Sequence, residues 1–255
     1  STNLLCFYFW HCSWLFHSDL SSSTSLCCTR RAAQLKKPPP VTVDGAWGLS
    51  PDNRRRLCIS SCYLVGFNRV MIKTMWLSTA IDVWKDIFSF SELNSCIALF
   101  FTVFLGICVQ QTVAYNSHIV PDRSWMAISE IGILSSLFIS LIVSKFLLNF
   151  RFYALALFLY SFSSFFLYMS CMINANVTNM YATKYAIRSD SNFDQAAISI
   201  TQTILQNCLG KVLAPILATI YWDSFGFFGY SLFNFALATS TVIFSNVFII
   251  GSSNN

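Results

Sequence analysis

The chain has 255 residues, of which 55% are hydrophobic, 16% are aromatic and only 11% are charged, with a formal net charge of +5. Soluble domains usually carry about 25% charged residues, so this composition excludes an ordinary soluble domain. A membrane span needs about 20 apolar residues, and the stretches 93–121, 152–183 and 224–255 contain no Asp, Glu, Lys or Arg. The sequence therefore predicts an all-α, multi-pass membrane protein embedded in the lipid bilayer.

The first 56 residues form a basic leader with several cysteines, in which an apolar run at 4–16 is followed by polar residues that include a serine run and three consecutive prolines at 38–40. This composition is typical of a disordered segment, or of sequence that is not natural coding sequence. Residues 57–92 are more apolar, but Arg69 and Lys73 interrupt them. They predict an amphipathic or interfacial segment rather than a span.

A transmembrane domain is expected over residues 93–251. Five spans are predicted in it, at about 93–117, 125–148, 152–174, 196–222 and 225–250. Basic residues mark the cytosolic side, so the leader is expected in the cytosol and residues 175–195 are expected to form an external loop. The sequon Asn176-Val177-Thr178 begins that loop, which predicts glycosylation of Asn176.

The fourth predicted span carries two different faces. One face has small side chains at every fourth position, which allow another helix to approach closely inside lipid: Gly210, Ala214 and Ala218. The adjacent face is polar and is expected to contact protein or a watery cavity: Ser199, Thr203, Asn207 and Lys211. Pro215 removes one backbone donor and is expected to bend the helix.

The end of the chain resembles the last two helices of the major facilitator superfamily of secondary transporters. The resemblance is carried by Leu209-Gly210 and Pro215, by Tyr221-Trp222 at the helix exit, and by Phe225-Gly226-Phe227. It covers roughly residues 90 to 251, and Asn179–Tyr185 resembles the loop at this point in the endolysosomal branch. The resemblance implies alternating-access transport of a small solute, in the plasma membrane or an endolysosomal membrane. The chain would represent the C-terminal half, with the N-terminal half missing.

Five spans conflict with one implication of this resemblance. A family half has six helices and a cytosolic C-terminus, whereas five spans from a cytosolic leader end outside. The resemblance also implies that the loop with Lys184 and Arg188 is cytosolic. We therefore expect one helix to be missing, between the third and fourth spans.

Four side chains are predicted to line the substrate pathway: Lys211, Asn207, Gln111 and Glu130. A charge at the depth of Lys211 costs about 2.5–3.5 kcal/mol, so it needs an acid, an anionic substrate or water. Glu130 is the acid within a predicted span, and pairing with Lys211 would permit a proton relay. Gln111 occupies a position where the resemblance implies a glutamate, so acid-driven coupling is not expected there. Structural snorkelling of Lys211 and interhelical hydrogen bonds are the alternatives.

The alternative function is that of a receptor or scaffold that does not transport. We find no catalytic constellation or convincing metal-ligand spacing in the sequence, so neither an enzyme nor a cofactor is expected. No basic fold with interleaved aromatic residues is present either, and nucleic acid is not an expected partner.

Overall fold

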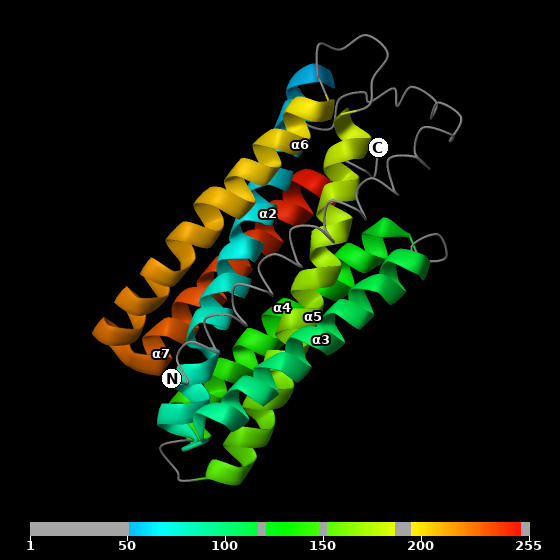
Figure 1. Ribbon diagram of the computed structural model, residues 1–255. Coiled ribbons are helices and arrows are strands. Elements are labelled where there is room, and N and C mark those ends of the chain that lie inside the picture. Colours follow the sequence, from blue (N-terminus) through cyan, green and yellow to red (C-terminus); the bar gives the residue numbers. More distant parts are fainter. Residues whose placement is uncertain (1–50, 117–120, 148–151, 187–194, 251–255) are drawn as a thin grey trace. The chain divides into compact units, whose positions relative to one another are not determined.

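The computed structural model describes residues 51–116, 121–147, 152–186 and 195–250, and every regular element within them is a helix (Figure 1). The elements are α2 (Pro51–Asp82), η1 (Val83–Ile87), α3 (Glu92–Asn116), α4 (Asp122–Ile142), η2 (Val143–Leu147), α5 (Tyr153–Ala186), α6 (Gln195–Thr203), η3 (Ile204–Gly210), α7 (Lys211–Phe244) and η4 (Ser245–Ile250). The η elements are π-helical segments that continue their neighbours. The predicted leader lies outside the described residues up to position 50, and residues 51–56 belong to α2.

Four helices in the described part of the chain are long and apolar enough to cross a membrane. They are Glu92–Asn116, Asp122–Phe146, Tyr153–Ala182 and Ala197–Ile249. The first two agree closely with the predicted spans 93–117 and 125–148. The third is longer than predicted, because α5 continues to Ala186. Most of the expected external loop 175–195 is therefore helical.

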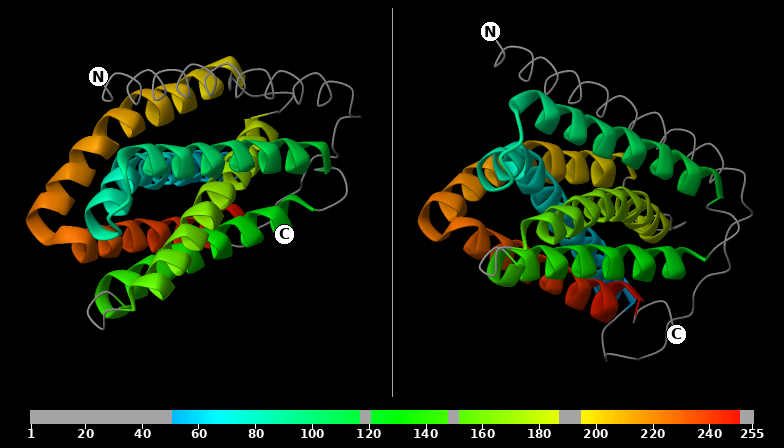
Figure 2. Two further views of the ribbon diagram at one scale, coloured as in Figure 1. Left: turned by 60° about the horizontal axis from the view of Figure 1, so that its bottom comes forward. Right: turned by 90° about the horizontal axis from the view of Figure 1, so that it is seen from below.

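The fourth candidate span is interrupted at Gly226. A straight helix of its 53 residues would be about 80 Å long, compared with about 30 Å for the bilayer core. Gly226 has φ 64° and ψ −167°, a conformation that breaks the helix and that side chains disfavour. The chain reverses direction there (Figure 2), as the predicted division between spans 196–222 and 225–250 requires.

The helix α2 lies inside the bundle, in contact with α5 and α7 (Figure 1). Val65, Ile72 and Met75 are at most 1% exposed. This burial favours a helix enclosed by protein over the predicted amphipathic or interfacial segment at 57–92. An interfacial helix would have one solvated face, whereas buried side chains occur along most of α2 and the other helices enclose it.

The small-residue face of the fourth predicted span packs against α2. Ala214 and Ala218 are at most 1% exposed and lie in one apolar cluster with Met71 and Met75 of α2. Gly210 is also buried and approaches Val70. The predicted close helix approach is thus confirmed, and its partner is α2.

The two ends of the bundle are defined by contacts between distant parts of the chain. At the end where α2 begins, here called the amino end, Cys58 Sγ donates a hydrogen bond to Phe248 O over 3.0 Å. At the opposite end, here called the turn end, the Trp84, Tyr160 and Phe227 rings form edge-to-face contacts with centroids 5.7–6.2 Å apart. The helices therefore alternate in direction between the two ends.

An exposed ion pair stabilises the connection between α2 and α3 at the turn end. Lys85 Nζ lies 3.1 Å from Glu92 Oε1. The hydrogen bond to Glu92 raises the pKa of Lys85 above its ordinary value. The lysine is therefore fully charged at neutral pH.

We predict that Gly106→Leu destabilises the bundle. A Cβ at Gly106 would collide with the Tyr168 ring of α5, which is 1% exposed and has no free space to move into. Overpacking of this kind costs roughly 1–3 kcal/mol, measured as a lower melting temperature of the purified protein. Leu105→Ile changes an exposed neighbour and serves as the control. Equal melting temperatures for the two variants would contradict the close packing of α3 on α5.

Candidate functional site

Three basic side chains from two helices lie near one another in the middle of the bundle. Arg69 and Lys73 are four residues apart on α2 and so share one face. Lys73 is close enough to Arg69 and to Lys211, the first residue of α7, for their charges to interact. We call these three residues the cationic group.

Arg69 is the most deeply buried member of the cationic group. It is 5% exposed, and its Nη2 donates a hydrogen bond to Gln206 Oε1 over 2.8 Å. Its Nε is buried without a hydrogen-bond partner, and so is Gln206 Nε2. A buried guanidinium is thus held by one neutral acceptor.

Two further residues shape the surroundings of Arg69. Cys171 of α5 is 1% exposed and lies within electrostatic reach of both Arg69 and Lys73. Gly66, one turn before Arg69 on α2, lets the Gln206 carboxamide pack directly on the helix, because any side chain at that position would collide with it. The site is therefore walled by α2, α5 and η3.

The polar face predicted on the fourth span is only partly covered by protein. Ser199 and Thr203 are exposed, whereas Asn207 and Lys211 are partly buried. The buried polar side chains of this helix are instead Gln202, which donates a hydrogen bond to Asn179, and Gln206. The face therefore leads from the exposed start of α6 to the cationic group.

Glu130 lies in a different interface. It is 3% exposed, its Oε2 accepts a hydrogen bond from Asn246 Nδ2 over 3.4 Å, and its Oε1 has no hydrogen-bond partner. Ser245 lies beside the same carboxyl group. The ion pair found among the described residues joins Lys85 to Glu92. The predicted pairing of Glu130 with Lys211 is therefore absent from this structure. The reason is that Glu130 faces the end of the chain rather than the first part of α7.

Gln111 does not join the cationic group. It is exposed on α3, which packs on α5 and α2 rather than on η3 and α7. Its neighbour Gln110 is buried and donates a hydrogen bond to Asn176 Oδ1 over 3.3 Å. The structure thus brings together Lys211 and Asn207, which are on one helix, but leaves Gln111 and Glu130 elsewhere.

The predicted glycosylation sequon lies within α5. Thr178, its third residue, is fully buried and donates its hydroxyl to Asn174 O over 2.8 Å. Asn176 itself is partly buried and bonded to Gln110. This geometry counts against the predicted glycosylation, because an acceptor sequon belongs on a surface loop.

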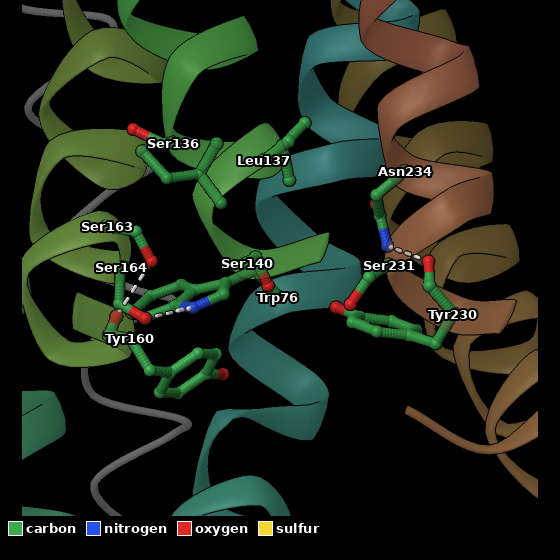
Figure 3. A pocket seen from close by; sticks show the side chains of 11 residues that line it. Trp76, Ser136, Leu137, Ser140, Tyr160, Ser163, Ser164, Tyr230, Ser231 and Asn234 are labelled. Atoms are coloured by element: carbon green, nitrogen blue, oxygen red, sulfur yellow. Dashed lines mark hydrogen bonds between the residues drawn. The ribbon is translucent and has the colours of Figure 1, made fainter. Parts of the chain in front are cut away.

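A separate small pocket lies between α2, α4, α5 and α7 (Figure 3). Trp76 Nε1 donates to Ser164 Oγ over 3.1 Å on one side, and Asn234 Nδ2 donates to Tyr230 O over 3.1 Å on the other. The volume is about 10 Å³, room for roughly one water molecule. The pocket is therefore too small for a solute.

Sequence reasoning missed Arg69 and Lys73 as candidate site residues. They are the two charged residues between Leu57 and Ile81, and their spacing of four places both on one helical face. A 25-residue stretch with two charges confined to one face fits a helix whose polar face is covered by protein. That spacing was the available signal.

Comparisons of the sequence with protein-family models and with curated proteins found no match. Within residues 51–116, 121–147, 152–186 and 195–250, no three His, Cys, Asp or Glu side chains gather into a group able to hold a metal ion. The arrangement of the cationic group is therefore the main guide to function.

We predict that Glu130→Gln leaves the melting temperature unchanged or raises it at neutral pH. Glutamine keeps the oxygen that accepts from Asn246 and removes the cost of burying a carboxylate without a cation. Glu92→Gln is the control, since it breaks an exposed ion pair worth about 0–1 kcal/mol. A loss above about 1 kcal/mol for Glu130→Gln would contradict this interpretation and indicate a required negative charge.

Proposed function

We propose that the chain forms one half of a secondary transporter of the major facilitator type, and that it carries a small solute past the cationic group. Three features of the described residues support the proposal: the number of helical passes, the distribution of charge between the two ends, and the polar face that leads to the cationic group.

The first support is the six-pass arrangement. In the proposed topology α2 is a span, followed by α3, α4, α5, the segment from α6 to the break at Gly226, and the remainder of α7 with η4. A central span enclosed by protein can carry polar residues that a lipid-facing span cannot. Six passes also remove the earlier conflict, with α2 as the additional helix before the first predicted span rather than one between the third and fourth.

The second support is the charge at each end. In the proposed orientation the amino end is cytosolic, and it carries Arg55, Arg56 and the end of α5 with Lys184. The turn end carries the acidic residues Asp82, Asp86, Glu92 and Asp223. Basic cytosolic loops are the rule in membrane proteins. Two lysines also lie at the turn end: Lys85, which pairs with Glu92, and Lys145, whose Nζ lies 5.1 Å from the centre of the Phe228 ring.

The observation that carries the proposal is the continuous polar face from Ser199 through Thr203 and Asn207 to Lys211. Two of its residues are exposed and two are partly buried, although their helix is apolar enough to span a membrane. Such a face requires water or another protein rather than lipid. Part of it lies in the π-helical segment η3, and π-helical turns occur frequently at functional sites.

The mechanism follows from these positions. The polar face provides a hydrated route from the amino end to the cationic group near mid-membrane, and a second half would close the route from the other side. Alternating access then requires one half to rock against the other about this site. A receptor or scaffold is the second candidate function, because six helices alone provide only one wall of such a pathway.

We predict that α2 crosses the membrane. Asp86→Cys, at the turn end, should react with an impermeant maleimide on intact cells, and Asn53→Cys, at the amino end, should react only after permeabilisation. Both positions are exposed, so each cysteine is accessible to the reagent. The wild-type chain gives the background from native cysteines. Reaction of both variants on the same side would show that α2 does not cross.

We predict that Lys211→Ala abolishes transport without affecting folding or trafficking. Charge-movement measurements on reconstituted membranes would use concentration jumps of acetate, phosphate, glutamate and glucose. The charged end of Lys211 lies on the pathway, so its removal should eliminate any signal that the wild-type chain produces. Lys85→Ala, which removes an exposed lysine at the turn end, should behave as wild type. Normal signals from Lys211→Ala would exclude it from the mechanism, and no signal from the wild-type chain would show that these helices alone do not transport.

A further inference from the structure

We propose that the cationic group and Gln206 form a binding site for an oxyanion, meaning a carboxylate or a phosphate group. This inference rests on the proposed function and deepens it, because it gives the chemical class of the solute.

Arg69 carries a charge that the described structure does not balance. Arg69 is 5% exposed, forms no ion pair with a carboxylate of the described residues, and donates one hydrogen bond to a neutral amide. The segments 53–81, 153–186 and 195–222, which surround it, contain no acidic residue. A buried charge is stable only when paired and hydrogen-bonded. A counter-charge for Arg69 therefore has to come from outside these helices.

The neighbours of Arg69 increase this requirement. Lys73 is near enough to Arg69 and Lys211 for mutual repulsion, and like charges held together in a weakly polar environment attract an anion strongly. A guanidinium offers several N–H donors in a rigid fork that matches the oxygens of carboxylates and phosphates. The combination of the Arg69 guanidinium with the ammonium groups of Lys73 and Lys211 suits an oxyanion better than a halide.

Gln206 occupies the position expected for such a ligand. Its Oε1 accepts from Arg69 Nη2 over 2.8 Å, while the neighbouring Nε of Arg69 remains without a partner. The amide oxygen of Gln206 thus occupies the place of one oxygen of an anion, and the second donor, Arg69 Nε, makes no hydrogen bond. An entering carboxylate would replace Gln206 and contact both nitrogens.

An anion can reach this position from the polar face of α6 and η3. Lys73, Lys211 and Asn207 are partly exposed, so the outer part of the site is accessible while Arg69 lies deeper. Basic residues at the mouth of a polar route raise the local concentration of anions. The site therefore has two lysines, Lys73 and Lys211, at its entrance and the buried Arg69 guanidinium at its inner end.

The decisive variant is Gln206→Glu. It introduces a carboxylate of nearly the same shape at 2.8 Å from Arg69 in the parent structure, and so supplies the missing counter-charge within the chain. We expect this variant to melt at a higher temperature than wild type without any added anion. We also expect it to lose the response to added anions, because Arg69 is already paired.

The experiment measures melting temperature for the full chain in phosphatidylcholine nanodiscs. Sodium phosphate and sodium acetate are titrated against sodium chloride at constant ionic strength, so that general screening is the same throughout. The wild-type chain should show a saturable rise with phosphate or acetate. Arg69→Lys should weaken the apparent affinity roughly tenfold, because lysine keeps the charge but loses the fork. Lys85→Gln at the exposed turn end should respond as wild type.

A second series with phosphatidylglycerol nanodiscs distinguishes the source of the anion. A saturable response to soluble anions, lost in Gln206→Glu, supports a solute site. A response confined to phosphatidylglycerol supports the same site with a lipid phosphate as its occupant. No response in either series, or an unchanged response in Gln206→Glu, overturns the proposal. Saturable binding without charge movement would show that these helices bind an oxyanion but do not transport it alone, and would leave the oxyanion site intact.

Discussion

The burial of Arg69 in a bundle of apolar helices is the constraint on which the rest of the structure depends. A guanidinium at this depth needs hydrogen-bond acceptors, and Gln206 Oε1 provides one over 2.8 Å. That contact brings η3 against α2, and the small residues Gly210, Ala214 and Ala218 allow the two helices to pack closely along the following turns. The position of α2 between α5 and α7 follows from these contacts.

The helices that face lipid were predictable from sequence, because lipid contact requires long uncharged runs. The predicted span 93–117 differs from α3 by one residue at each end, and the division between the last two spans falls next to the break at Gly226. The enclosed position of α2 was not predicted, since protein covers its surface and a covered surface need not be apolar. The end of α5 was also missed, because polar residues such as Asn174 and Thr178 find partners inside the bundle.

The candidate site was predictable only in part for the same reason. Lys211 and Asn207 were identified because they interrupt an apolar helix, and a charge in such a helix is conspicuous. Arg69 and Lys73 lie in a segment with weaker hydropathy, where the same charges indicated an interfacial helix. Their proximity to Lys211 depends on tertiary packing between distant parts of the chain. Arg69 and Gln206, which are in contact, are 137 residues apart in the sequence. Similarly, no sequence pattern indicated that Glu130 faces Asn246.

The long separation between Arg69 and Gln206 has a consequence for biosynthesis. Gln206, the acceptor of Arg69, emerges from the ribosome only after α3, α4 and α5 have been made. Until then Arg69 lacks this acceptor, and a helix with unsatisfied central charges inserts poorly into a bilayer. In the topology proposed above, stable insertion of α2 therefore awaits the synthesis of η3. Truncation of the chain before residue 206 would leave a nascent product in which Arg69 lacks this acceptor, and which membrane quality control would recognise through α2.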